Sequence, residues 1–267
     1  MALIHCRFFS KSLFMNTDIT VIIPTFSSSN LQGGPDAGYI KPGKKCKVLY
    51  LLHGIYGDCS NWERYTRIEQ YADDHGLAVV MPSAENSFYT DMAHGQRYYT
   101  YIGEELPAFA EMMFPISDRR EDTFIAGLSM GGYGAYKLAL SRPEKFSCAA
   151  SLSGALDIKA LYLEAQRQGN MPFSISDIWE SADSIAETGS DLLVLLQQLK
   201  EQGKDIPRLY QACGTEDPMY ALNTAVRDRI RGMGVDLTFY EEHGAHEWSF
   251  WDRTIAKVID WLPLQEG

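Results

Sequence analysis

The stretch Thr123-Phe124-Ile125-Ala126-Gly127-Leu128-Ser129-Met130-Gly131-Gly132-Tyr133-Gly134 decides the fold. It begins as a short apolar strand, passes through a glycine-flanked turn and continues as a helix with small residues on one face. Gly127 and Gly131 bracket Ser129 at the G-x-S-x-G spacing of a nucleophile elbow, which lifts the serine hydroxyl clear of the sheet. The pentapeptide alone occurs by chance in many chains, so the strand before it and the helix after it make Ser129 the candidate nucleophile.

The same turn predicts where the negative charge of a developing oxyanion would be bound. The backbone amide of Met130 stands at the start of the helix, where it is free to bind a developing oxyanion. A second donor is expected after the apolar strand Cys46–Leu52, because Gly54 permits an unusual backbone angle that turns the Ile55 amide toward the serine. Without Ser129, the simpler interpretation of these residues is an ordinary strand-to-helix turn.

A serine hydroxyl needs a base to accept its proton and an acid to orient that base. Asp217 follows the expected strand Arg208–Cys213, and His246 follows the expected strand Val235–Tyr240. The order serine, acid, histidine is that of α/β-hydrolases, in which each residue comes from a loop beyond a strand's carboxyl end. Asp217 is therefore the predicted acid and His246 the predicted base.

Other side chains compete for these two roles. Asp217 precedes Pro218, and an aspartate in such a place often caps a helix instead. Glu216 and Asp157 are the alternative acids, and His243 is the alternative base. Order along the chain favours Asp217 and His246 without excluding the others.

The rest of the chain alternates strands and helices. Two strands at the start, Ala2–Ser12 and Asp18–Pro24, predict an antiparallel hairpin, and the later apolar strands suit a mostly parallel central sheet. Single helices are expected over Asn61–His75 and over Tyr99–Phe114, the second bent at Pro107. The predicted class is α/β, an α/β-hydrolase fold with helices on both faces of the sheet.

We expect one domain over residues 1–267. The pattern changes from Ala155 to Asp205, where short helical pieces and polar runs indicate a cap-like insertion over the active site. A peripheral helical layer is the alternative. The segment Ser27–Lys45 is rich in serine, glycine, proline and lysine and is expected to be a loop.

Composition excludes several classes of function. The net charge of −11 and a pI of about 5.0, without a basic stripe, argue against nucleic-acid binding. No apolar run is long enough to predict a membrane span, and no signal peptide is indicated. Five scattered cysteines without a CxxC pair predict no metal site and suggest reduced thiols in the cytoplasm.

Four motifs together resemble one family. They are Leu51-Leu52-His53-Gly54-Ile55 with Asn61-Trp62, Gly127 to Ala135, Cys213 to Asp217, and Gly244-Ala245-His246-Glu247-Trp248 followed by Trp251. The set resembles the esterase D/S-formylglutathione hydrolase-like serine esterases, most closely the small bacterial tributyrin esterase type, in the broad superfamily of the mycobacterial antigen 85 acyltransferases. The resemblance implies the roles already given to Ser129, Asp217 and His246, an oxyanion hole of Ile55 and Met130, no cofactor, and a homo-oligomer.

The function that follows is a serine carboxylesterase for short-chain acyl esters, working through an acyl-enzyme on Ser129 with a small-molecule ester as substrate. Hydrolysis of S-formylglutathione or another thioester is the alternative, because the same three residues serve a thiol leaving group. An acyltransferase and a non-catalytic binding protein on the same fold are further alternatives. Trp62 and Tyr99 are candidate substrate contacts, with ordinary packing as the other interpretation.

Overall fold

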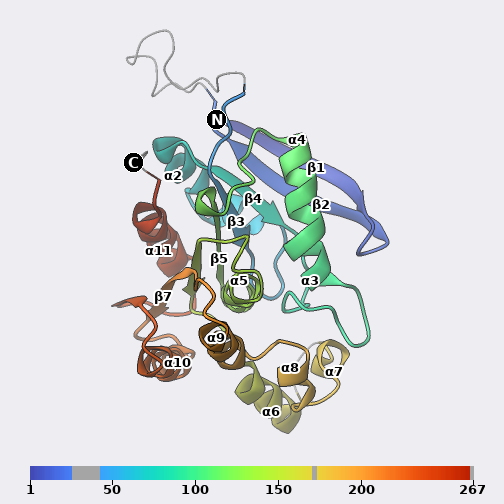
Figure 1. Ribbon diagram of the computed structural model, residues 1–267, viewed down its shortest axis with the longest axis vertical. Coiled ribbons are helices and arrows are strands. Elements are labelled where there is room, and N and C mark those ends of the chain that lie inside the picture. The colour runs from blue at the N-terminus through green and yellow to red at the C-terminus, as the bar shows by residue number, and fades with distance from the viewer. Residues whose placement is uncertain (26–42, 170–172, 265–267) are drawn as a thin grey trace.

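Eight strands form one sheet in the order β1-β2-β4-β3-β5-β6-β7-β8 (Figure 1). A computed structural model of the protein describes residues 1–25, 43–169 and 173–264, so the expected loop at Ser27–Lys45 lies outside them up to residue 42. The strands are β1 (Ala2–Ser10), β2 (Met15–Ile23), β3 (Val48–Leu52), β4 (Ala78–Pro82), β5 (Thr123–Leu128), β6 (Cys148–Leu152), β7 (Arg208–Gly214) and β8 (Leu237–Glu242). The pairs β1–β2 and β2–β4 are antiparallel and the others parallel, which confirms the predicted sheet and its N-terminal hairpin.

The inner strands are buried because their side chains alternate between two apolar layers. In β3, Val48, Tyr50 and Leu52 enter one layer, whereas Leu49 and Leu51 enter the other. Successive side chains of a strand point to opposite faces, so a strand covered on both sides must be apolar throughout. This is why continuous apolar runs mark the parallel strands in the sequence.

Helices cover both layers (Figure 1). One face carries α1 (Asn61–Tyr65), α2 (Ile68–His75) and α11 (Trp248–Trp261), and the other carries α3 (Tyr98–Thr100), α4 (Leu106–Met113), α5 (Met130–Ser141), α9 (Leu192–Glu201) and α10 (Tyr220–Gly232). Their inner faces hold apolar residues at helical spacing, as Trp251, Ile255 and Val258 of α11 illustrate. The expected helices on both faces of the sheet are confirmed.

The predicted single helix over Asn61–His75 is wrong in one respect, because the structure has two helices there. Thr66 is extended, with φ −137° and ψ 173°, and separates α1 from α2. Its hydroxyl donates to the carbonyl of Trp62 and accepts from the amide of Ile68 at 3.2 Å. These local bonds replace the helical ones, which is how threonine competes with a helix.

The predicted helix over Tyr99–Phe114 is also interrupted. A π-helical segment, Tyr101–Glu105, joins α3 to α4, and Pro107, which has no amide hydrogen to donate, lies in the first turn of α4 directly after it. Glu105 at the end of this segment accepts hydrogen bonds from the amides of Lys11 and Ser12 at 2.6 and 2.8 Å. The irregular segment thus carries the carboxylate that holds the turn of the N-terminal hairpin.

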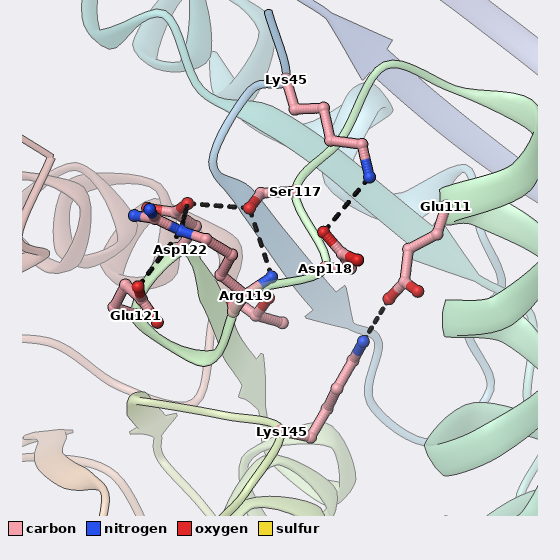
Figure 2. Close-up of polar contacts among 9 residues, drawn as sticks. Lys45, Glu111, Ser117, Asp118, Arg119, Glu121, Asp122 and Lys145 are labelled. Atoms are coloured by element: carbon pink, nitrogen blue, oxygen red, sulfur yellow. Dashed lines mark hydrogen bonds and ion pairs between the residues drawn. The ribbon is translucent and has the colours of Figure 1, made fainter.

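Ion pairs gather at the amino ends of β3 and β5 (Figure 2). They are Lys45 with Asp118 at 3.2 Å, Arg119 with Glu121 at 3.1 Å and with Asp122 at 3.0 Å, and Lys145 with Glu111. Pairs of this kind near the surface are screened by solvent, so they contribute little to the stability of the fold. A cavity of about 1180 Å³ lies beside them. It is at the amino ends of the parallel strands, whereas Ser129 follows the carboxyl end of β5.

Four helices occupy the described part of the segment expected to be an insertion, residues 155–169 and 173–205. They are α6 (Ile158–Gln168), α7 (Ile175–Ile178), α8 (Ser184–Glu187) and α9, of which α6, α7 and α8 gather together beyond α9 (Figure 1). The amides of Ala93 and His94 donate to the carbonyls of Ile178 and Asp177 at 3.2 and 2.8 Å. These bonds hold the segment against the long loop that follows β4.

Candidate active site

Ser129 occupies a strained turn between β5 and α5. Its φ of 52° and ψ of −116° lie in a region of backbone angles that residues other than glycine rarely adopt. Three backbone bonds hold it there: its amide donates to Leu152 at 2.9 Å, and its carbonyl accepts from Tyr133 and Ala155, both at 3.2 Å. The turn therefore has the strained geometry of a nucleophile elbow.

The two glycines of the elbow are required by close packing. A Cβ on Gly127 would stand 2.4 Å from the carbonyl of Gly131, and one on Gly131 would stand 2.5 Å from the carbonyl oxygen of Leu52. Any side chain at either position would push α5 away from β3 and β5. The sequence spacing around Ser129 thus reflects the approach of a helix to two strands.

The loop after β3 lies against the nucleophile turn. A Cβ on Gly54 would come within 3.4 Å of the Ser129 Cβ and 2.6 Å of Leu128 Cδ1, so a side chain there would require the Leu128 side chain to move. Gly54 is not among the glycines with positive φ, so the close approach and not a left-handed backbone favours glycine here. Among the described residues, neither the Ile55 amide nor the Met130 amide donates a hydrogen bond. Met130 directly follows Ser129, and Ile55 directly follows Gly54, so the amide of each predicted oxyanion donor has its N–H group unused.

His53 fixes this loop through three hydrogen bonds. Its Nε2 accepts from the amide of Ala84 at 2.9 Å, so Nδ1 carries the proton that it donates to the carbonyl of Gly54 at 2.6 Å. Its own carbonyl accepts from the hydroxyl of Tyr89 at 2.9 Å. Burial lowers the pKa of His53 to about 4 and outweighs the bond to Gly54, which acts in the other direction. His53 is a positioning residue whose role the sequence alone did not assign.

We expect stability to fall as the pH drops from about 6.5 to 4, because of His53. Its ordinary pKa is 6.5 and its folded pKa about 4, so between these values the unfolded chain binds a proton that the folded chain excludes. The loss should reach about 3 kcal/mol, and stability from this source is complete above pH 6.5. Urea unfolding near pH 7.5 and near pH 4.5 measures it.

The variant His53→Gln isolates this effect, since glutamine does not titrate. Between pH 6.5 and pH 4, the free energy of unfolding of the unmodified protein should fall by about 3 kcal/mol more than that of the variant. His94→Gln is the matched control, because His94 is exposed. An unchanged pH dependence in His53→Gln would exclude His53 as the source.

The structure brings Asp217 and His246 together. Asp217 follows β7, His246 lies between β8 and α11, and His246 Nδ1 lies 3.1 Å from Oδ1 and 2.9 Å from Oδ2 of the carboxylate. The Asp217 side chain has no exposed surface, whereas that of His246 is 30% exposed. An acceptor on Nδ1 places the proton there, so Nε2 is left to act as the base.

The environment of Asp217 keeps it ionised. Burial alone raises its pKa, but hydrogen bonds and charge from His246, with bonds from Ser153 and the Met219 amide, outweigh burial and lower the pKa. A carboxylate held in this way stabilises a positive imidazole. Asp217 therefore suits the acid's role electrostatically.

Trp251 links the histidine to the elbow. Its ring stands at 89° to the His246 ring with 4.9 Å between centroids, and its indole N–H donates to the Ser153 hydroxyl at 3.1 Å. Ser153 directly follows Leu152, whose carbonyl binds the Ser129 amide. Within the described residues, neither the Ser129 hydroxyl nor His246 Nε2 has a hydrogen bond, and catalytic bonds often tighten only when substrate binds.

The competing residues lie elsewhere. Glu216 pairs with His243 at 2.8 Å, and both are exposed, with 46% and 91% of their side chains accessible. Asp157 caps α6 by accepting from the amide of Ala160 at 3.0 Å. Among the bonds of the described residues, no side-chain hydrogen bond or ion pair joins Glu216, His243 or Asp157 to Asp217 or His246.

The two expected substrate contacts have other neighbours. Trp62 is 1% exposed, and its indole N–H donates to the carbonyl of Leu52 at 3.0 Å, so it packs in the core. Tyr99 is half-buried, with the ammonium of Lys137 5.4 Å from its ring. Phe88, in the loop after β4, is a further aromatic residue that contacts the insertion, because its ring lies 5.5 Å from that of Trp179.

A cavity of about 410 Å³ adjoins the loop after β3. Tyr56, Asn86 and Met92 line it from the loops after β3 and β4, and Phe173 and Ile178 line it from the insertion. Tyr56 follows Ile55 directly and its amide donates to Asn86 at 2.8 Å. Sequence reasoning missed this cavity because it is formed by three distant segments.

The described residues contain neither a membrane-spanning helix nor a metal-binding cluster. No helix within residues 1–25, 43–169 and 173–264 is both long and apolar enough to cross a membrane. In the same part of the chain, no three histidine, cysteine or acidic side chains gather as metal ligands would.

Comparison with known proteins places these features in a family. Residues 35–262 match the sequence profile of the Esterase family. An acetyl esterase of Caldicellulosiruptor saccharolyticus is 33% identical over 98% of this chain and 98% of its own length.

Two solved structures from Staphylococcus aureus are similar throughout. The fluorophosphonate-binding serine hydrolase FphF, solved with substrate bound, is 34% identical with a TM-score of 0.84, and the alignment covers 99% of each chain. The S-formylglutathione hydrolase FrmB is 34% identical with a TM-score of 0.83 and the same coverage. These neighbours confirm the α/β-hydrolase fold that the sequence predicts.

Proposed function

The chain belongs to the Esterase family and is a serine esterase, and we propose that it hydrolyses short-chain carboxylic esters through an acyl-enzyme on Ser129. The observation that carries this proposal is the strained Ser129 turn, together with the hydrogen-bonded pair of a buried Asp217 and a partly exposed His246 in the loops after β7 and β8. The acetyl esterase relative supports a small acyl group.

In the first half-reaction, His246 Nε2 takes the hydroxyl proton as Ser129 Oγ attacks the ester carbonyl. The carbonyl oxygen becomes an oxyanion that accepts hydrogen bonds from the amides of Ile55 and Met130. When the tetrahedral species collapses, the bond to the alcohol oxygen breaks, and His246 gives the proton to that oxygen. The alcohol leaves and the acyl group stays on Ser129.

Water completes the cycle by the reverse route. His246 removes a proton from a water molecule, whose oxygen attacks the acyl carbonyl, and the same two amides hold the second oxyanion. The bond to Ser129 Oγ breaks and the serine regains its proton from His246. Asp217 stays ionised throughout and stabilises the imidazolium formed in each half-reaction.

Thioester hydrolysis is the second candidate, favoured by the likeness to FrmB. The chemistry at Ser129 is the same, so the leaving-group pocket decides between the two. We propose that the leaving group enters the cavity beside the loop after β3, where Glu85 and Asp177 supply two carboxylates and no cationic side chain lines the cavity among the described residues. This lining disfavours glutathione, which carries two carboxylates of its own, and supports a neutral alcohol.

Turnover of p-nitrophenyl acetate and S-formylglutathione by one preparation tests the proposal. We expect kcat/KM for the ester to be the larger, and a larger value for the thioester would make the second candidate the function. Added alcohol that diverts the acyl group from water would indicate an acyltransferase instead. Failure of a fluorophosphonate to label the protein would indicate a non-catalytic binding protein.

Four further proposals concern the organisation, assembly, location and partners of the protein. We propose one domain over residues 1–267 with a cap-like insertion at about 155–205, supported by the backbone bonds from Ala93 and His94 to the insertion. We also propose a homo-oligomer, a cytoplasmic location, and no nucleic-acid or membrane partner. Support for these comes from the family resemblance, the cysteine pattern and the acidic composition.

A further inference from the structure

Lys137 is a buried lysine that the esterase chemistry does not use. It lies on α5, two turns beyond Ser129, and is only 2% exposed. It forms part of a cavity of about 310 Å³, whose other lining residues are Thr90, Asp91, Tyr99, Ser141, Thr188 and Gly189. The cavity has room for several water-sized groups, since a water molecule takes about 30 Å³ in the liquid.

The Lys137 ammonium has one donor to spare. Nζ donates to Thr90 Oγ1 at 2.7 Å and to Ser190 Oγ at 3.2 Å, and an ammonium has three N–H groups. Among the described residues, no carboxylate lies within 4 Å of Nζ, although Asp91 is close enough to interact through its charge. A buried cation without a paired anion is unfavourable, so this cavity favours an anion.

The remaining polar groups of the cavity determine which anion fits. The Thr90 and Thr188 hydroxyls donate to the carbonyls of Phe88 and Ser184, so they offer no hydrogen. Tyr99 and Ser141 also line the cavity, and Ser141 acts to lower the pKa of Tyr99, so their hydroxyls lie beside each other; a bond between them would use one hydroxyl hydrogen and leave the other free. One ammonium donor and one hydroxyl donor together match the two oxygens of a carboxylate.

Asp91 limits the charge of the ligand. Its carboxylate accepts from the amide and hydroxyl of Thr100 at 2.9 and 2.6 Å, and Arg97 Nε lies 3.6 Å from it. These contacts neutralise it in part, but it still repels anions at the cavity wall. A single lysine beside it balances one negative charge and not the two of a phosphate.

We propose that this cavity binds a small monocarboxylate of the size of acetate, held by the Lys137 ammonium and the Tyr99–Ser141 hydroxyl pair. The acid released from a short-chain ester belongs to this class, so the enzyme's own product can occupy the site. Binding is measured without turnover, so a failed binding test leaves the esterase assignment untouched.

The site should take up a proton with its ligand. Burial lowers the pKa of Lys137 to about 7 and outweighs the charge of Asp91, which acts in the other direction. Tyr99 and Tyr133 also face Nζ, and burial raises the pKa of both, so they stay neutral. A bound carboxylate favours the charged amine, so affinity should fall about tenfold from pH 6 to pH 8.

Calorimetric titration with sodium acetate near pH 6 and near pH 8 tests the proposal, with chloride and neutral acetamide as control ligands. We expect a dissociation constant of about 1–10 mM near pH 6, the tenfold loss near pH 8, and no binding of either control ligand. Heats in buffers of different ionisation enthalpy should show proton uptake near pH 8. Equal binding of chloride, or affinity independent of pH, would overturn the proposal.

Variants locate the site. Lys137→Met should abolish acetate binding, Tyr99→Phe should weaken it several-fold, and Lys159→Met, which removes an exposed lysine, should leave it unchanged. If Lys137→Met does not fold, the Lys137 side chain can be followed by NMR in the unmodified protein, where saturating acetate should raise its pKa by at least about one unit. An unmoved Lys137 pKa, or binding retained in Lys137→Met, rejects the site.

Discussion

Replacing Ser129 by alanine should lower kcat for p-nitrophenyl acetate by about 10⁵- to 10⁶-fold, because no acyl-enzyme can form without the hydroxyl. The oxyanion donors remain, so a small rate above that in water persists. The backbone of the turn is already held at φ 52° by three hydrogen bonds, so alanine should keep the fold and the melting temperature nearly unchanged. Stopped assays at high enzyme concentration measure the residual rate.

Labelling with a fluorophosphonate supports the same experiment. The unmodified protein should gain one covalent adduct on Ser129, and Ser129→Ala should gain none. Ser249→Ala is the matched control, because Ser249 is exposed and lies three residues from His246, and it should keep both activity and label. Hydrolysis that survives in Ser129→Ala would show that another residue attacks the ester.

The variant Asp217→Asn should lower kcat by about 10⁴-fold with little change in KM. An asparagine amide presents N–H as well as oxygen to His246, so the tautomer with a free Nε2 is no longer enforced and the imidazolium loses its counter-charge. Because the carboxylate is fully buried 2.9 Å from Nδ1, no solvent ion can replace it. Steady-state kinetics across pH measure the loss.

Two variants separate Asp217 from its competitors. Glu216→Gln and Asp157→Asn remove the carboxylates that pair with His243 and cap α6, so each should keep kcat within about threefold. Near-full turnover in Asp217→Asn, together with a large loss in either control, would assign the acid's role to that other residue.

Much of this architecture is predictable from the sequence. Apolar runs mark the inner strands because both of their faces are covered, and the spacing of Gly127, Ser129 and Gly131 reports the tight approach of α5 to β3 and β5. The order of Ser129, Asp217 and His246 follows from where the strands end. Such features depend on periodicity and local sterics, which a single sequence records.

Other features depend on contacts between distant segments. Periodicity did not predict the helix break at Thr66, because that break comes from hydrogen bonds of one hydroxyl. Trp251 is recognisable as an inner-face residue of α11, but its bond to Ser153 crosses 98 positions in the chain. Trp62, a candidate substrate contact, instead packs beneath the loop that His53 fixes. Predicting each of these features requires knowing which group the threonine hydroxyl or the indole N–H binds.

The contact of His246 with Trp251 has a consequence for biosynthesis. A ribosome delivers Ser129 well before it delivers α11, whose tryptophan supports the histidine ring and whose apolar face closes one layer of the core. On the proposed chemistry, a nascent chain that already contains the Ser129 turn still lacks His246, the base that activates the serine hydroxyl. Hydrolytic competence therefore arrives in a single late step, and partly synthesised chains cannot act on cellular esters.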